Sequence, residues 1–266
     1  MSRLRPAKSP ARSVVVIPAR YGSTRLPQKM LLRDTGKPLL QYTFEAARDA
    51  RRPDSVVVAT DHPQIAREVE RFGGQVVMTS PDCASGTDRV AEAARQLEGA
   101  QIIVNVQGDE PEISPAAIDH VIELLERNPS AGMTTLATPI RDPAQLTNPA
   151  CVKVVCDDAG RALYFSRSQI PFIRDAPERA GSSSTPDFND PPIFFQHLGL
   201  YAYRRDELLR FATLEPSSLE LAEKLEQLRL LQSGGVIVVD VVQHASSGID
   251  TPADYAAFVE RRRKAG

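Results

Sequence analysis

The 266-residue sequence has no tryptophan and only three cysteines, Cys83, Cys151 and Cys156. Because their number is odd and none are spaced as Cys-x-x-Cys, they indicate neither a disulfide framework nor a zinc site. No apolar run approaches the length of a membrane span, and the basic residues 1–13 lack the apolar segment of a signal peptide. These absences predict a soluble, cytoplasmic protein without a membrane partner, with a disordered basic tail over 1–13.

A strong excess of one charge is also missing. The chain has 32 Lys and Arg against 34 Asp and Glu, a formal net charge of −2. This balance argues against a general nucleic-acid binder, so any basic site must be local. Hydrophobic content of 42% and charged content of 25% are ordinary for a globular protein. The length allows one large domain, or a domain with an insertion.

Two familiar phosphate-binding loops are absent as well. A dinucleotide fingerprint needs three spaced glycines after a strand, and only Gly22 follows the first apolar run. Gly36-Lys37 comes closest to a P-loop, but Pro38 stands where Ser or Thr is required. A phosphate site in this chain must be of another kind.

The stretch 14–29 joins a strand to a basic loop. Four β-favouring residues, Val14 to Ile17, predict a strand buried on both faces, and we expect Pro18 to end it because proline cannot donate to a ladder. The loop that follows carries three cations, two hydroxyls and a glycine: Arg20, Arg25, Lys29, Ser23, Thr24 and Gly22. Open α/β sheets bind ligands beyond the carboxyl ends of their strands. The loop therefore predicts a polyphosphate site, with a solvated basic loop as the alternative.

Strands alternate with helices over the first half of the chain. Further strands are expected at 55–60, 75–79 and 102–106, and helices at 38–50, 63–72, 87–97 and 115–127, with Asp61 as an N-cap and Ser114-Pro115 as a helix start. This βαβ alternation predicts an α/β fold with a largely parallel sheet and right-handed crossovers.

After Gly132 the pattern changes. The expected elements are strands at 133–138, 197–203 and 236–242, a β-hairpin from 152–156 and 162–165, and helices at 205–211, 219–232 and after Pro252. We predict one domain over 14–266, with an antiparallel region inserted at about 150–215. Residues 175–192 are rich in Pro, Ser, Asp and Gly and are expected to form a loop or linker.

Two acidic segments could complete a metal–nucleotide site. The strand at 102–106 leads into Asp109 and Glu110, which places carboxylates at the same sheet edge as the basic loop. Mg²⁺ takes one or two carboxylates together with phosphate oxygens, although Glu110 could instead cap the next helix. Asp250, just before Pro252, is by itself better explained as a helix N-cap, and becomes a ligand candidate only alongside Asp109.

Several other polar residues have two possible roles. Ser85 to Arg89 could be a capped helix start or the wall of a base pocket with Arg89 turned inward, and the residues alone do not decide. His197 and Tyr201 share one face of a strand. Taken singly, these two and the remaining polar candidates are more readily structural than functional: Ser166, Arg167, Glu226 and Gln227.

Seven segments of the chain, taken in order, resemble the 3-deoxy-manno-octulosonate cytidylyltransferase (CMP-Kdo synthetase) family. The matching segments are 17–27 with Lys29, 85–89, 104–111, 164–168 with 170–172, 197–204, 225–229 and 248–252. They extend over about residues 14–260, which makes the resemblance far more specific than any single motif.

The resemblance implies a Rossmann-like nucleotidyltransferase fold, with a mixed, mostly parallel central sheet and a smaller antiparallel subdomain for sugar binding and dimerisation. It implies a homodimer whose substrates are CTP and the sugar acid Kdo. The products would be pyrophosphate and CMP-Kdo, the activated sugar for lipopolysaccharide biosynthesis. The implied cofactor is Mg²⁺.

Carried over residue by residue, the resemblance assigns three sets. The CTP-binding set is Ala19, Arg20, Gly22, Ser23, Arg25, Lys29, Ser85, Gly86, Thr87, Arg89 and Gln107. The sugar-binding set is Gln107, Arg167, His197, Tyr201, Glu226 and Gln227, with Arg167 suited to pair with the sugar carboxylate. The metal ligands are Asp109 and Asp250, and the expected catalytic residues are Arg20, Lys29, Asp109 and Asp250.

The sequence departs from the family pattern at Cys83, where the family usually has histidine, and at Gln28-Lys29-Met30, where Gly-Lys-Pro is common. Cys83 leaves the shape of the base pocket open. Two alternatives to the Kdo enzyme also stay open. One is a transferase for 8-amino-Kdo or a sialic acid, and the other is a catalytically silent CTP or sugar sensor. The intact cations and carboxylates argue against the sensor.

Overall fold

The computed structural model describes residues 13–23, 25–174, 192–243, 246 and 248–265. The expected basic tail therefore lies outside the described residues except for Ser13, which begins the first strand. Thr24 and nearly all of the expected 175–192 loop also lie outside them.

The first half of the chain forms the parallel part of the sheet. Its strands are β1 (Ser13–Ala19), β2 (Ser55–Thr60), β3 (Gln75–Met78) and β4 (Ile102–Asn105), in the order β3-β2-β1-β4. Helices α1 (Leu39–Asp49), α2 (Pro63–Arg71) and α3 (Gly86–Gln96) connect them. Val15 and Ile17 pack into one apolar cluster and Val14 and Val16 into another, so β1 is buried on both faces as predicted.

The second half extends the same sheet with mixed pairing. Strands β5 (Met133–Pro139), β8 (Phe195–Arg204) and β9 (Ile237–Val241) follow β4 in the order β8-β5-β9. β8 is antiparallel to both β4 and β5, whereas β5 and β9 are parallel. β6 (Lys153–Cys156) and β7 (Ala162–Ser166) form the expected hairpin, and β6 attaches it to β8. The α/β fold with a mixed, mostly parallel sheet is thus confirmed.

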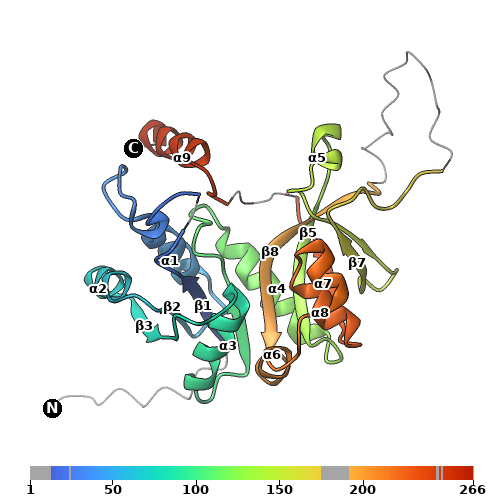
Figure 1. Ribbon diagram of the computed structural model, residues 1–266, viewed down its shortest axis with the longest axis horizontal. Coiled ribbons are helices and arrows are strands. Elements are labelled where there is room, and N and C mark those ends of the chain that lie inside the picture. The colour runs from blue at the N-terminus through green and yellow to red at the C-terminus, as the bar shows by residue number, and fades with distance from the viewer. Residues whose placement is uncertain (1–12, 24, 175–191, 244–245, 247, 266) are drawn as a thin grey trace.

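The remaining helices are α4 (Pro115–Arg127), α5 (Pro143–Thr147), α6 (Arg205–Phe211), α7 (Ser218–Glu223), α8 (Gln227–Gln232) and α9 (Pro252–Ala265), with a short 3-10 turn at Lys29–Leu31. Figure 1 shows α9 beside α1, whereas α7 and α8 lie on the side of the hairpin. Within the described ranges, no helix has both the length and the apolar content to cross a bilayer.

Three local expectations were wrong. Pro18 does not end β1 but lies within it opposite Ala59, which is tolerated because pairing with β4 has already stopped at Val16. The N-cap of α2 is His62, whose Nδ1 accepts from the Gln64 amide, and not Asp61. The single helix expected over 219–232 is two helices, because Lys224 is left-handed (φ 54°) and ends the first.

Candidate active site

A cavity of about 370 Å³ lies where the loops after β1 and β4 meet. Eleven of its lining residues belong to the predicted sets: Arg20, Ser23, Arg25, Lys29, Ser85, Gly86, Arg89, Gln107, Asp109, Glu226 and Asp250. Parallel strands bring their carboxyl ends to one sheet edge, so loops about 80 residues apart along the chain face each other here. We call this the cationic cavity.

A second cavity, of about 210 Å³, adjoins it. Gly86, Gln107 and Glu226 line both cavities. Three further members of the predicted sets, Thr87, Tyr201 and Gln227, line only the second, together with Tyr203, Lys224 and Leu225, which were not predicted. We call this the polar cavity. The shared residues place Glu226 and Gln107 at the junction of the two.

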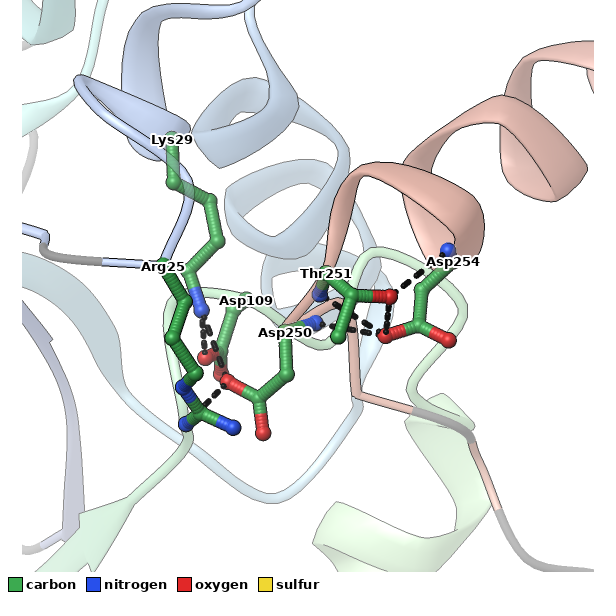
Figure 2. A network of polar contacts seen from close by, with 6 residues as sticks. All are labelled: Arg25, Lys29, Asp109, Asp250, Thr251 and Asp254. Carbon is green, nitrogen blue, oxygen red and sulfur yellow. Dashed lines mark hydrogen bonds and ion pairs between the residues drawn. The ribbon is translucent and has the colours of Figure 1, made fainter.

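Lys29 joins the two carboxylates predicted to bind metal (Figure 2). Its Nζ lies 2.5 Å from Asp109 Oδ2 and 3.2 Å from Asp250 Oδ1, although these residues are far apart along the chain. Arg25 Nη2 lies 3.0 Å from the same Asp250 oxygen. Lys29 is only 7% exposed. Both carboxylates therefore reach one buried point, which a cation occupies.

The start of α9 explains why Asp250 is free to do this. The carboxylate of Asp254 accepts from the amides of Asp250 and Thr251, and the Asp254 amide donates to Thr251 Oγ1. Thr251 and Asp254 thus form a reciprocal cap, so the interpretation of Asp250 as the N-cap was wrong. The Thr251 hydroxyl is the main cause that lowers the pKa of Asp254.

Close packing between the two loops fixes the position of Asp109. A Cβ at Gly108 would lie 2.9 Å from the Pro18 carbonyl oxygen, so only glycine lets the loops approach this closely. The Gly108 carbonyl accepts from Thr43 Oγ1, and the Asp109 carbonyl accepts from the Ile249 amide at 2.9 Å. The second bond ties the segment that carries Asp250 to the one that carries Asp109.

The segment 85–89 is a capped helix start that also lines the cationic cavity with Arg89 turned inward. Ser85 caps α3, accepting from the Asp88 amide. Arg89 is turned inward, 4% exposed, and donates to Thr79 Oγ1 at 2.6 Å while lying 3.4 Å from Asp61. Its guanidinium thus forms a fixed wall of the cationic cavity.

Cys83 also lines the cationic cavity. Its thiol donates to Glu92 Oε2 at 3.1 Å. Burial, followed by the Glu92 carboxylate, raises the pKa of the thiol to about 11, so it is neutral near pH 7. At this position the chain therefore presents a small neutral group.

The polar cavity contains polar atoms that lack a partner. Among the described residues, no group bonds Glu226 Oε2 or Gln227 Nε2, although both atoms are buried. Burial is the main cause that raises the pKa of Glu226, and hydrogen bonds from Thr87 and Ser85 oppose it. Unpartnered buried groups are costly, so their presence beside a cavity indicates a ligand that satisfies them.

Four predicted residues line neither cavity. Ala19 is the last residue of β1, and Gly22 lies within the basic loop. His197 packs against Tyr201, with ring centroids 5.4 Å apart, and its Nε2 shares a hydrogen bond with Thr135 Oγ1. Burial lowers the pKa of His197 to about 3, so this ring is neutral. Arg167 directs its guanidinium at the backbone carbonyls of Pro149, Glu223 and Lys224, of which only Lys224 lines a cavity.

Two functional candidates escaped the sequence reasoning about sites. Glu110 faces Gly199 and accepts from Ser246 Oγ, and burial raises its pKa to about 7. The sequence placed it beside Asp109 at the sheet edge, with a helix cap as the alternative, but assigned it to none of the three residue sets. Lys153 is fully buried in the hairpin. The sequence signal for Lys153 was a lysine at an inward-facing position of an otherwise apolar strand.

Comparisons with known proteins agree with this geometry. The cytidylyltransferase family model matches residues 14–240. A 3-deoxy-manno-octulosonate cytidylyltransferase from Rhodopirellula baltica is 49% identical over 93% of this chain and 97% of its own length. The enzyme of the same name from Geobacter sulfurreducens is 49% identical over 92% of this chain and 97% of its own.

A solved structure gives the same result. The structure of a CMP:2-keto-3-deoxy-manno-octonic acid synthetase complexed with CTP superimposes with a TM-score of 0.86 at 39% identity, covering 96% of this chain and all of that one. A 4-diphosphocytidyl-2C-methyl-D-erythritol synthase from Anaerococcus prevotii, 12% identical with a TM-score of 0.58, shares the fold alone. This chain belongs to the 3-deoxy-manno-octulosonate cytidylyltransferase family.

Proposed function

We propose that this enzyme transfers the cytidylyl group of CTP to Kdo, giving CMP-Kdo and pyrophosphate for lipopolysaccharide biosynthesis. The observation that carries the proposal is the pair of adjoining cavities, one cationic and one polar, with Glu226 and Gln107 at their junction. Two substrates that react with each other need such neighbouring sites. The CTP complex of the 39% identical relative supports the nucleotide half.

In the proposed arrangement the cationic cavity holds CTP. Arg20, Arg25 and Lys29 offset the charge of the triphosphate and of the departing pyrophosphate. The inward guanidinium of Arg89 and the neutral thiol of Cys83 bound the space left for the base. The anomeric hydroxyl of Kdo attacks the α-phosphorus in line, and positioning supplies most of the rate because phosphoryl chemistry needs little covalent help.

Asp109 and Asp250 fit a magnesium ion. Both carboxylates already reach one cation, the ammonium of Lys29, and Mg²⁺ needs only one or two carboxylates beside phosphate oxygens. Within the described residues, no group of three or more His, Cys, Asp or Glu side chains could hold a metal alone, so nucleotide oxygens would complete the site. When bound, Mg²⁺ polarises phosphate oxygens and lowers the pKa of the attacking hydroxyl.

The polar cavity receives the sugar acid in this proposal. A polyhydroxylated sugar supplies both acceptors for Gln227 Nε2 and donors for Glu226 Oε2, the two buried atoms without partners among the described residues. Tyr201 and Gln107 line the same space. Direct contacts from Arg167 and His197 to the sugar stay predictions.

Mg²⁺-dependent pyrophosphate release tests the proposal, with each nucleoside triphosphate crossed against Kdo, 8-amino-Kdo and a sialic acid. Release with CTP and Kdo alone is the expected result. Release with CTP and a different acid would keep the chemistry but move the specificity to that acid. CTP binding without release for any pair would contradict the proposal and make the protein a sensor.

We further propose that the chain forms a homodimer through the region at about 150–215. Leu163 and Phe172 in that region are large apolar residues, 62% and 83% exposed, which a partner surface would cover. Sedimentation analysis of the wild type and of Leu163→Ser with Phe172→Ser tests this. A monomeric wild type would contradict it.

A further inference from the structure

The guanidinium of Arg167 donates hydrogen bonds to three backbone carbonyls in two segments of the chain. Its Nε donates to the Glu223 carbonyl at 2.7 Å, Nη2 to the Lys224 carbonyl at 3.2 Å, and Nη1 to the Pro149 carbonyl at 2.9 Å. Each donor bond holds the end of α7 or the loop before β6. Arg167 itself lines neither cavity.

A carboxylate and an ammonium complete this set of contacts. The Glu223 carboxylate accepts from Ser166 Oγ at 2.6 Å and from the Arg167 amide at 2.9 Å. Lys153, with no exposed surface, donates its Nζ to the carbonyls of Arg167, Cys151 and Asn148 at 2.6, 2.6 and 3.1 Å. Lys153, Arg167 and Glu223 therefore interlock the hairpin, the preceding loop and the end of α7.

These contacts reach the turn at Lys224, which leads into the residues that line the polar cavity. Lys224 adopts a left-handed conformation (φ 54°), which is unfavourable for a residue with a Cβ and needs support from its surroundings. Its carbonyl is one of the three that Arg167 holds. Glu226 and Gln227 follow within three residues and carry the unpartnered buried atoms of the cavity.

We propose that Lys153, Arg167 and Glu223 are positioning residues for the sugar acid. They fix the Lys224 turn so that Glu226 and Gln227 project into the polar cavity at set positions. This differs from the direct carboxylate contact that the family resemblance suggests for Arg167. The inference rests on the proposed placement of Kdo in the polar cavity.

The first test measures KM for Kdo and for CTP in Arg167→Lys, Glu223→Gln and Lys153→Met. We expect KM for Kdo to rise tenfold or more and KM for CTP to change less than threefold. Arg161→Lys, on the same hairpin but paired with Asp157 at the surface, is the matched control and should match the wild type. Should Lys153→Met fail to fold, Glu223→Gln carries the test, because it keeps the shape of the side chain.

The second test separates positioning from direct contact. Binding of Kdo and of its carboxamide is compared in the wild type and in Arg167→Lys. A positioning role weakens both by the same factor, so the preference for the acid over the amide is unchanged. Selective loss of that preference would make Arg167 a ligand of the carboxylate and would overturn the inference.

A final variant distinguishes this inference from the placement on which it rests. Gln227→Ala should raise KM for Kdo. If it does not, the sugar is not in the polar cavity and both proposals fall. If it does, while folded variants of Lys153, Arg167 and Glu223 keep the wild-type KM for Kdo, the placement stands and the positioning role alone is wrong.

Discussion

The cationic cavity is built mainly from loops that directly follow β1 and β4, whereas the polar cavity is assembled from α3, β8 and the turn between α7 and α8. In the first, strand order brings Lys29 and Asp109 together, and the Ile249–Asp109 hydrogen bond adds Asp250. In the second, a left-handed turn held by hairpin contacts delivers Glu226 and Gln227. One site therefore depends on sheet topology and the other on tertiary support.

Their electrostatics differ in the same way. In the cationic cavity, Lys29 pairs with Asp109 and Asp250, and Arg25 pairs with Asp250. The polar cavity instead keeps neutral or unpartnered groups in low-dielectric surroundings, such as Gln227, which is 5% exposed. Charge changes should damage the first site, and small displacements should damage the second.

The largest effect should come from Asp109→Asn, which keeps the shape of the side chain but removes its charge. We expect kcat to fall by about a hundredfold or more, as for other preorganised charge-stabilising contacts. Pyrophosphate release across a magnesium titration measures this. Glu112→Gln, a nearby surface carboxylate paired with Arg261, should stay near wild type. Near-normal turnover of Asp109→Asn at saturating Mg²⁺ would show the metal assignment to be wrong.

Lys29→Met tests whether the Lys29 ammonium and Mg²⁺ compete for the carboxylates of Asp109 and Asp250. Without Mg²⁺ the two facing carboxylates lose their cation, and the free energy of unfolding should fall by about 2 kcal/mol, less than for a fully buried pair because Asp250 is half exposed. Mg²⁺ should then stabilise the variant more than the wild type.

Urea unfolding with and without Mg²⁺ measures the Lys29 effect, and Lys37→Met, whose ammonium pairs with Glu45 away from the cavity, is the control. Equal stabilisation of variant and wild type by Mg²⁺ would mean that Lys29 does not share the metal position.

His197→Asn tests whether the buried ring beside the polar cavity is neutral. Burial holds the pKa of His197 at about 3, below its ordinary 6.5, so the unfolded chain binds a proton first and stability is lost as the pH falls. Between pH 7.5 and 5.5 the wild type should lose about 1.4 kcal/mol more than the variant. His120→Asn, which removes a surface histidine paired with Asp240, is measured alongside as the comparison variant. Equal losses in His197→Asn and the wild type would refute the neutral ring.

The smallest effect is expected from Asp254→Ala, which removes the cap that frees Asp250. The loss of the reciprocal cap should cost about 1 kcal/mol in unfolding free energy. It should also raise the magnesium concentration needed for half-maximal rate, because the Asp250 amide loses its acceptor. Glu260→Ala, on the same helix, controls for general effects on α9. An unchanged magnesium requirement would mean that the cap does not position Asp250.

The cationic cavity was largely predictable because its residues follow buried strands directly. Once the first four strands were identified, topology required Lys29 and Asp109 to face each other. The errors there were local. Pro18 lies inside β1 because the pairing of β1 with β4 stops at Val16, before the proline. Asp250 is free because Thr251 takes the cap.

The polar cavity was predictable only through family resemblance. Apolar periodicity over 219–232 favours one helix, and nothing local marks Lys224 as left-handed. The conformation becomes possible through contacts from Arg167, more than fifty residues away along the chain. The sugar-binding role of Arg167 came from the resemblance alone and stays a prediction. Its hydrogen bonds to carbonyls could not be predicted locally, because they depend on where α7 ends, which is a tertiary outcome.

The most direct test of the account measures KM for CTP and for Kdo in Arg20→Ala and Gln227→Ala. Arg20 lines only the cationic cavity and Gln227 only the polar one. We predict that Arg20→Ala raises KM for CTP about tenfold and that Gln227→Ala raises KM for Kdo by a similar factor, each leaving the other constant nearly unchanged. A Gln227→Ala enzyme with a raised KM for CTP and a normal KM for Kdo would contradict the division of the site into two cavities with separate substrates.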